Sequence, residues 1–376
     1  MNRKHFLIVL LALAIVGGAG LVLLRHNKEA WSVREAKMGD PVLPGFKPND
    51  VAAIHLKGTS EIHIAQANGI WRVRERGDYP ANYQQIKNCL IKLRDLKVVQ
   101  AEEVGPSQLA RVELEEPGKE AGGATLIEFS DAKGKLLNSL RVGKRHLRPQ
   151  DPTVPAGLHG LYDGRYVLLP SDPGSVLLIS DELAGVSSEP ESWLDHDFIK
   201  VDHVRSVSLT STNAADSWSI ARETESAAWT LADFHADKGE ALATSVVSQI
   251  GELLPFIAFM DVVPKTSASE KYFKNAKRLK VETFDHFTYD IKVSPKQSDG
   301  NYLIAVAVTA EKSGQSKESL AKLEKESKIA AAPWDYAVEA RIMDLLVRDR
   351  AQLIEKKAVG SGEVGDLSPR PLSLGR

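Results

Sequence analysis

The densest group of residues able to bind a metal lies near the middle of the chain. Asp195, His196 and Asp197 are consecutive, and His203 follows six residues later. Carboxylates and imidazoles are common ligands of divalent metals. The segment, however, precedes an expected strand, where polar residues usually face solvent or cap a turn. We expect no metal or other cofactor, and we keep these four residues as the place where a metal-dependent hydrolase would hold its ion.

Other reactive side chains indicate structure rather than chemistry. His55 and His63 fall on adjacent expected strands and could face each other, as polar residues on a half-exposed sheet do. Cys89, the one cysteine, recurs with apolar residues at helical spacing, which favours a buried thiol over a nucleophile. The basic segment 141–148 could meet an anion or a lipid headgroup, but such a run is typical of a solvated turn.

No motif for nucleotide or acyl chemistry is found in the sequence. The 27 glycines form neither a P-loop nor a dinucleotide fingerprint, and there is no Gly-x-Ser-x-Gly turn. The composition also bears on the number of domains and on nucleic-acid binding. The 376 residues are 43% apolar with a formal net charge of −2, which leaves length for two or three domains but no basic surface for nucleic acid. We therefore expect no catalytic residue and no nucleic-acid partner.

One apolar run could cross a membrane. Phe6–Leu24 has no charge over 19 residues, and a helix of that length reaches roughly 28 Å, close to the hydrocarbon thickness of a bilayer. Arg3 and Lys4 would also suit a cleaved signal peptide, but the run is longer than the apolar part of such peptides. We expect residues 1–24 to be a cytoplasmic head and an uncleaved signal anchor in the lipid bilayer.

The expected anchor also sets where the rest of the chain lies. Its basic residues are balanced across the run, so the charge count alone does not settle orientation, but long domains translocate largely regardless of charge. We expect a single-pass protein of the bacterial inner membrane with its bulk periplasmic or extracytoplasmic. Within the run, Ala14, Gly17 and Gly18 form a small-residue face on which a partner helix could pack closely.

The remaining sequence repeats one order of elements. The first copy has strands at 50–56, 61–67 and 69–74, a helix at 82–96 and a strand at 98–103; the second has strands at 203–209, 218–222 and 228–231, a helix at 240–254 and an extended segment at 256–263. Trp71 and Trp229 are 158 residues apart, while Leu90 to Ile250 and Leu93 to Leu253 are each 160. The two tryptophans are expected to anchor their sheets as core residues.

The repeat continues downstream. Segments 124–130 and 136–142 correspond to 278–284 and 288–293, and Tyr166–Leu169 with the apolar stretch Val176–Leu183 would correspond to Tyr336–Val338 with a helix at Ile342–Ile354. Segment 311–328 is expected to be an exposed helix. These patterns predict an α+β fold in which an N-terminal transmembrane helix precedes two tandem repeats, each an antiparallel-rich sheet packed against one or two helices.

The order of elements resembles a known family. An apolar N-terminal helix, the strand Asp50–Leu56, the Gly-x-Trp strand at Gly69–Trp71, an amphipathic helix and the Tyr-Val-Leu strand at Tyr166–Leu168 are together similar to the domain of unknown function 4340 family. The resemblance covers roughly residues 4–355. It implies a single-pass bacterial membrane protein with tandem copies of the unit, associated with auxiliary subunits of gliding-motility-type ABC transporters. Where the family has a Tyr-Gly-Leu-x-x-Pro segment, this chain has 111–117 instead, and the resemblance implies no active-site residue.

Repeat and resemblance together divide the chain. We expect a head and anchor at 1–24, a linker at 25–45, a first α+β repeat at 46–190, a second at 191–357 and a disordered tail at 358–376. The expected function is a non-enzymatic scaffold or auxiliary subunit of a bacterial ABC-type transport or surface-machinery complex. Two alternatives stay open: a ligand-binding module for a glycan or envelope component, and the metal-dependent hydrolase.

Overall fold

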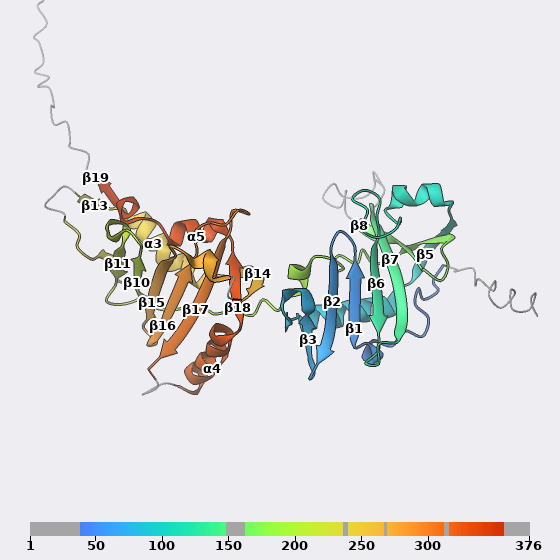
Figure 1. The fold of residues 1–376 in the computed structure, drawn as a ribbon, viewed down its shortest axis with the longest axis horizontal. Coiled ribbons are helices and arrows are strands. Elements are labelled where there is room, and N and C mark those ends of the chain that lie inside the picture. The colour runs from blue at the N-terminus through green and yellow to red at the C-terminus, as the bar shows by residue number, and fades with distance from the viewer. Residues whose placement is uncertain (1–37, 148–161, 236–239, 267–268, 312–315, 357–376) are drawn as a thin grey trace, which may run out of the picture. The chain divides into compact units, whose positions relative to one another are not determined.

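The computed structural model describes residues 38–147, 162–235, 240–266, 269–311 and 316–356 (Figure 1). It divides into two units, residues 1–195 and 196–376. The expected anchor and tail lie outside the described residues. Within the described ranges, no helix combines the length and the apolar character that a membrane span requires.

The first unit is built on one antiparallel sheet of nine strands in the order β4-β3-β2-β1-β6-β7-β8-β9-β5. Its elements are β1 Ala53–Lys57, β2 Glu61–Ala67, β3 Ile70–Val73, β4 Tyr79–Pro80, α2 Tyr83–Asp95, β5 Val98–Glu103, β6 Thr125–Ser130, β7 Leu136–Leu147, β8 Tyr162–Leu168 and β9 Ser175–Ile179.

The second unit has a sheet of eight strands in the order β12-β11-β10-β15-β16-β17-β18-β14, and a short β13-β19 pair. Its elements are β10 Val204–Thr210, β11 Trp218–Ala221, β12 Thr230–Leu231, β13 Glu240–Leu242, α3 Thr244–Leu253, β14 Phe259–Pro264, β15 Lys277–Thr283, β16 Phe287–Val293, β17 Tyr302–Ala310, α4 Lys317–Ala331, β18 Trp334–Val338, α5 Ala340–Leu346 and β19 Ile354–Lys356. The fold is thus α+β with antiparallel sheets and few helices.

The two sheets share one strand order. From β3 to β5 the first sheet runs β3-β2-β1-β6-β7-β8-β9-β5, and the second runs β12-β11-β10-β15-β16-β17-β18-β14. In each unit the helix α2 or α3 precedes the strand that closes the far edge of the sheet, β5 or β14. Eight strand positions and one helix therefore correspond between the units.

This strand order corrects part of the correspondence expected from the sequence. Tyr166–Leu169 lies at β8. The strand at the same position in the second sheet is β17, whereas Tyr336–Val338 belongs to the next strand, β18. The apolar stretch Val176–Leu183 contains strand β9, and its counterpart is β18. The expected helix Ile342–Ile354 ends at Leu346, because a turn, a 3-10 helix and β19 follow it.

The helix register differs by one residue from the expected value. The buried side chains Ile86 and Cys89 of α2 match Val247 and Ile250 of α3 at a separation of 161 residues, not 160. At this register Gly251 takes the place of Leu90. A separation of 160 would align the buried Ile86, Cys89 and Leu93 with Val246, Gln249 and Leu253, none of which is buried.

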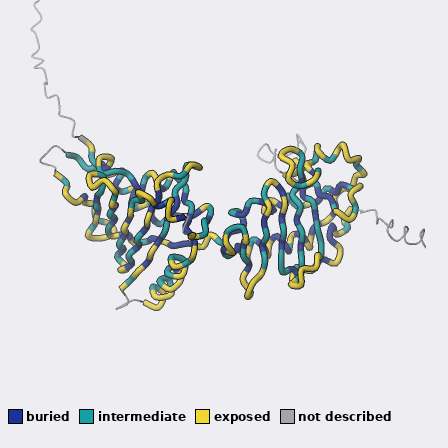
Figure 2. The backbone as a smooth tube through the Cα atoms, viewed as in Figure 1, coloured by how far each residue is buried: buried dark blue, intermediate teal, exposed yellow. Residues whose placement is uncertain are grey.

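Helix α2 covers one face of the first sheet. Burial alternates along the strands, as the alternation of dark blue with teal and yellow in Figure 2 shows. Ile54, Leu56, Ile62 and Ile64 point to the face that α2 covers, and their neighbours in sequence point to the other face. Burying the aliphatic side chains of this face removes apolar surface from water, which stabilises the unit.

Two segments outside the sheet complete the first unit. Val42 and Leu43, which the sequence placed in a linker, are buried, because the amide of Val42 donates to the Leu96 carbonyl just after α2. On the uncovered face, the 3-10 helix Pro106–Val112 and its flanking loop pack beside β7 and β8 around Leu114 and Leu168. The β2-β1-β6 part of that face stays open.

Candidate functional site

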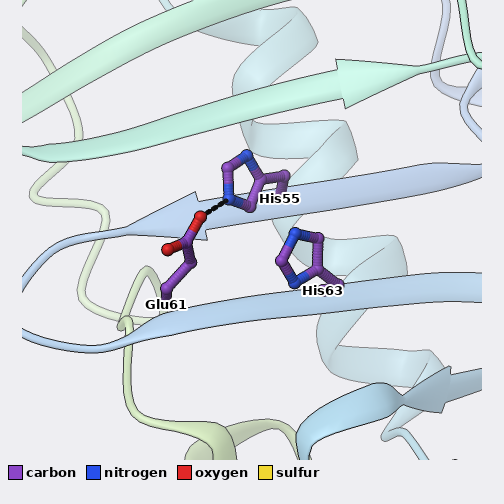
Figure 3. Close-up of side chains that lie close together, drawn as sticks. All are labelled: His55, Glu61 and His63. Carbon is purple, nitrogen blue, oxygen red and sulfur yellow. Dashed lines mark hydrogen bonds and ion pairs between the residues drawn. The ribbon is translucent and has the colours of Figure 1, made fainter.

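Two histidines project from the open face of the first sheet. β1 and β2 form an antiparallel hairpin in which His55 lies directly opposite His63. Because Leu56 and Ile62 beside them point to the core, both imidazoles point to the open face. The rings stack with centroids 4.4 Å apart and planes 12° apart. In Figure 3 both side chains stand in front of the strands, with α2 behind.

Three carboxylates surround the histidine pair. His55 Nε2 lies 2.8 Å from Glu61 Oε1, and His55 Nδ1 lies 2.9 Å from Glu128 Oε2 on β6. Glu75 binds His63 twice, with Oε1 2.8 Å from Nδ1 and Oε2 accepting from the His63 amide at 2.9 Å. Each imidazole Nδ1 thus has a carboxylate partner.

A neutral His55 cannot donate a hydrogen bond to both of its carboxylate partners. A carboxylate only accepts, and a neutral imidazole carries one N–H. With a carboxylate beside each ring nitrogen, the neutral ring can donate to only one of them, and a cation bound at the other nitrogen would complete the contacts of His55. The pKa of Glu61 is lowered, chiefly by its hydrogen bond with His55, so this side chain is a carboxylate at neutral pH.

The corresponding positions of the second unit hold different residues. Ser208 of β10 lies opposite Ser219 of β11 on one side and Lys280 of β15 on the other. His55 lies in the same way between His63 and Glu128. The same sheet therefore forms without imidazoles or carboxylates at these places, so the fold itself does not require the His–Glu cluster.

The cluster has the composition of a metal site. His55, Glu61 and His63 each offer one ligand atom, and the three atoms lie within 4.8 Å of one another. Among the described residues, this is the one such group of three. The side chains of His55, Glu61 and His63 are 27%, 49% and 41% exposed, so an ion could enter from solvent.

Asp195, His196, Asp197 and His203, the metal candidates from the sequence, do not form a group of three ligand atoms in the described structure. The main chain of Asp195 pairs with Pro80 and Tyr79 in the first unit. In the second unit, His196 Nδ1 lies 3.2 Å from the Phe259 carbonyl, Asp197 pairs with Lys325, and His203 pairs with Glu225. Each of these three side chains in the second unit has a separate partner. The segment forms the end of one unit and the entry to the next.

The two repeat tryptophans differ in burial. Trp71 on β3 is 6% exposed and forms part of the core. Trp229, just before β12, is only half-buried: its ring faces the guanidinium of Arg222 at 4.7 Å and its edge lies against Gly251. Trp229 is thus not the core anchor expected from the sequence. Gly251, which takes the place of Leu90, has no side chain, so the Trp229 ring lies against the backbone of α3.

A groove lies beside each tryptophan. The first, about 740 Å³, lies between Trp71, the Phe46–Val51 segment and α2; the second, about 500 Å³, lies between Trp229, His203 and α3. The lining positions of α2 and α3 match at the 161-residue separation. The Trp71 ring is buried, and Arg222 lies over one face of the Trp229 ring.

Three further expectations concern Cys89, the basic segment 141–148 and the small residues of the expected anchor. Cys89 is buried, and burial raises the pKa of its thiol to about 12, as expected of a structural thiol. The basic segment is not a turn, because Arg141–Leu147 continues strand β7, where Arg141 pairs with Glu116 and His146 with Asp163. Ala14, Gly17 and Gly18 lie outside the described residues.

The family comparison agrees with the resemblance found in the sequence. The family described as Domain of unknown function (DUF4340) matches residues 71–276, more than half of the chain, and the match extends from Trp71 in the first unit to Ala276 in the second. The chain belongs to the DUF4340 family. Searches of curated proteins and of solved structures gave no match to this DUF4340 chain. The His–Glu cluster on β1 and β2 lies N-terminal to the matched residues, except for Glu75 and Glu128.

Sequence reasoning placed the two histidines opposite each other but missed their carboxylates. Glu61 follows a short turn after β1 and could have been found from the hairpin alone. Glu128 comes 73 residues after His55, and its approach depends on β6 pairing with β1. No local pattern in the sequence predicts that pairing.

Proposed function

We propose that this DUF4340 chain is a membrane-anchored, non-enzymatic scaffold or auxiliary subunit of a bacterial ABC-type transport or surface-machinery complex. Phe6–Leu24 would hold it in the inner membrane, with the two units on the periplasmic or extracytoplasmic side. Ala14, Gly17 and Gly18 would pack against a helix of a membrane partner. The implied association of the family with ABC-type transporters supports this assignment.

The observation that carries the proposal is the repeated strand order. Two units with one topology are best explained as a tandem duplication, which gives the chain two binding platforms on one anchor. Each platform has a helix-covered face and polar side chains on the opposite face. Those side chains include His55 and Glu128 in the first unit and Ser208 and Lys280 in the second.

The difference between the two open faces also supports a scaffold. Polar and charged side chains at an interface select the partner through complementary charge. The first face carries a His–Glu cluster, while the second carries serines and a lysine at corresponding places. Two copies that keep one core but differ on the open face would hold two different partner surfaces.

The alternatives have less support. The hydrolase required Asp195, His196, Asp197 and His203 to converge, and the side chains of His196, Asp197 and His203 contact separate partners. A glycan-binding module would use an exposed aromatic face, whereas Trp71 is buried and Arg222 already lies over one face of the half-buried Trp229.

Affinity purification tests the proposal. Cells that produce the tagged full chain would be crosslinked, their membranes solubilised, and the captured proteins identified by mass spectrometry. We expect ABC-type ATPase or permease subunits. Capture of the intact chain without any such subunit would contradict the proposal.

A pair of anchor variants tests the lateral contact. Gly18→Leu adds bulk to the small-residue face, whereas Val16→Leu lies about 200° away on an expected helix. Recovery of the partner should fall for Gly18→Leu and stay unchanged for Val16→Leu. Equal recovery with both variants would exclude this face as the contact.

A further inference from the structure

We propose that His55, His63 and Glu61 form a binding site for a divalent transition-metal ion, with Zn²⁺ as the ion of best fit. Two imidazole nitrogens and one carboxylate oxygen are the ligand set of many three-residue zinc sites. Imidazole favours zinc over the harder cations magnesium and calcium, which prefer oxygen ligands. The site does not depend on the scaffold role, since it can be tested on the isolated chain.

The carboxylates behind the histidines are the second argument. Metal-binding histidines usually donate their other N–H to a carboxylate or carbonyl, which fixes the ring and its tautomer. Glu128 lies at Nδ1 of His55 and Glu75 at Nδ1 of His63. His63 therefore keeps Nε2 for an ion, and Nε2 of His55 faces Glu61, the third proposed ligand, on the same open face of the hairpin.

Charge balance is the third argument. Glu61, Glu75 and Glu128 bring three carboxylates to two imidazoles within one cluster. Lys57, directly opposite Glu61, offsets only part of this negative charge, and a divalent cation between His55 Nε2 and Glu61 would compensate the rest. The hydrogen bond of 2.8 Å between these two atoms already brings two ligand atoms together.

Binding requires movement of all three side chains, because the two stacked rings must tilt before their nitrogen lone pairs can meet at one ion. Zinc bonds of about 2.0–2.2 Å place tetrahedral ligand atoms roughly 3.3 Å apart, whereas the three ligand atoms here lie within 4.8 Å. Glu61 is half exposed and adjacent to a turn, so its carboxylate can move toward both rings. Three protein ligands leave a fourth position for water or for a donor atom from a bound protein.

Zinc titration tests the site. The full-length chain, purified in detergent with a tag that lacks histidines and stripped of metal, would be titrated with Zn²⁺ against a chromophoric chelator. We expect one site that weakens tenfold or more in His55→Ala and in His63→Ala. Glu128→Gln and Glu75→Gln should weaken binding by about 10–100-fold, as loss of an outer carboxylate does.

A matched control separates this site from surface binding. His203→Ala removes another exposed His–Glu pair, from the second unit, and should leave affinity unchanged. The proposal is overturned if His63→Ala weakens zinc binding less than tenfold, if the intact chain binds no zinc, or if His203→Ala has an equal effect.

X-ray absorption of the zinc-loaded intact chain gives an answer independent of any variant. The expected spectrum has a nitrogen and oxygen shell at about 2.0–2.2 Å with scattering from two imidazoles. A shell without imidazole scattering would overturn the site, even if a histidine variant failed to fold.

Discussion

Replacing Gly251 with alanine tests the packing of Trp229 on helix α3. Glycine inside a helix is less favourable than alanine by about 0.8–1.0 kcal/mol, so the change alone should stabilise the protein. Here an added Cβ would lie 2.5 Å from Cζ2 of the Trp229 ring, closer than real contacts allow. Forcing an extra group into a packed place costs about 1–3 kcal/mol, so we expect a net loss of about 1 kcal/mol.

A second variant isolates the cause. In a Trp229→Leu background the ring is gone, and Gly251→Ala should then stabilise the protein by nearly its full helix propensity. The coupling between the two changes should be about 1–3 kcal/mol, in the range measured for residues in contact. Gln249→Ala, an exposed change on the same helix, serves as a control and should shift stability by less than 0.5 kcal/mol.

Urea unfolding followed by far-UV circular dichroism measures these differences. Midpoints and slopes would be compared for the single and double variants, since a changed slope marks an altered unfolded state. If Gly251→Ala stabilises equally with and without Trp229, the ring does not pack on α3.

Three further predictions concern buried groups. Cys89, whose pKa is raised to about 12 by burial, should resist iodoacetamide at pH 8 until urea unfolds the chain, as mass spectrometry would show; rapid labelling would refute its burial. Tyr289→Phe removes a hydrogen bond of 2.8 Å to the buried Glu326 and should cost about 1.5–3 kcal/mol in urea unfolding; no loss would show that the bond contributes nothing. Burial raises the pKa of Asp335, so its ionisation opposes folding as pH rises. Asp335→Asn should therefore stabilise the chain at pH 7 relative to its effect at pH 3.5, and an equal effect at both pH values would contradict this.

Periodicity predicted most single elements of the fold. Strands at 61–67 and 98–103 have the expected bounds, because alternating side chains beside a turn mark a strand clearly. Strand β17, Tyr302–Ala310, was missed, since its run of small and aliphatic residues has no alternation of apolar and polar side chains. The 3-10 helix Arg350–Leu353 begins at Asp349, whose side chain caps it and separates it from α5.

Long-range pairing limited what could be predicted of the site. The hairpin of β1 and β2 brings His55 to His63 within eight residues, so their approach follows from local pattern. Glu128 reaches His55 only because β6 pairs beside β1. Asp195, His196 and Asp197 suggested a metal site because they are consecutive in the sequence. In an extended chain, however, neighbouring side chains point in different directions, so closeness in sequence does not bring them together.

Site-specific photo-crosslinking tests the scaffold role most directly. A photoreactive residue would replace Ala65 or Lys280 on the two open sheet faces, and Gln84 on the exposed side of α2 as a control. The account predicts crosslinks in native membranes to ABC-type transporter subunits from the sheet positions and none from Gln84. Crosslinks from Gln84 alone, or none from either sheet face, would contradict it.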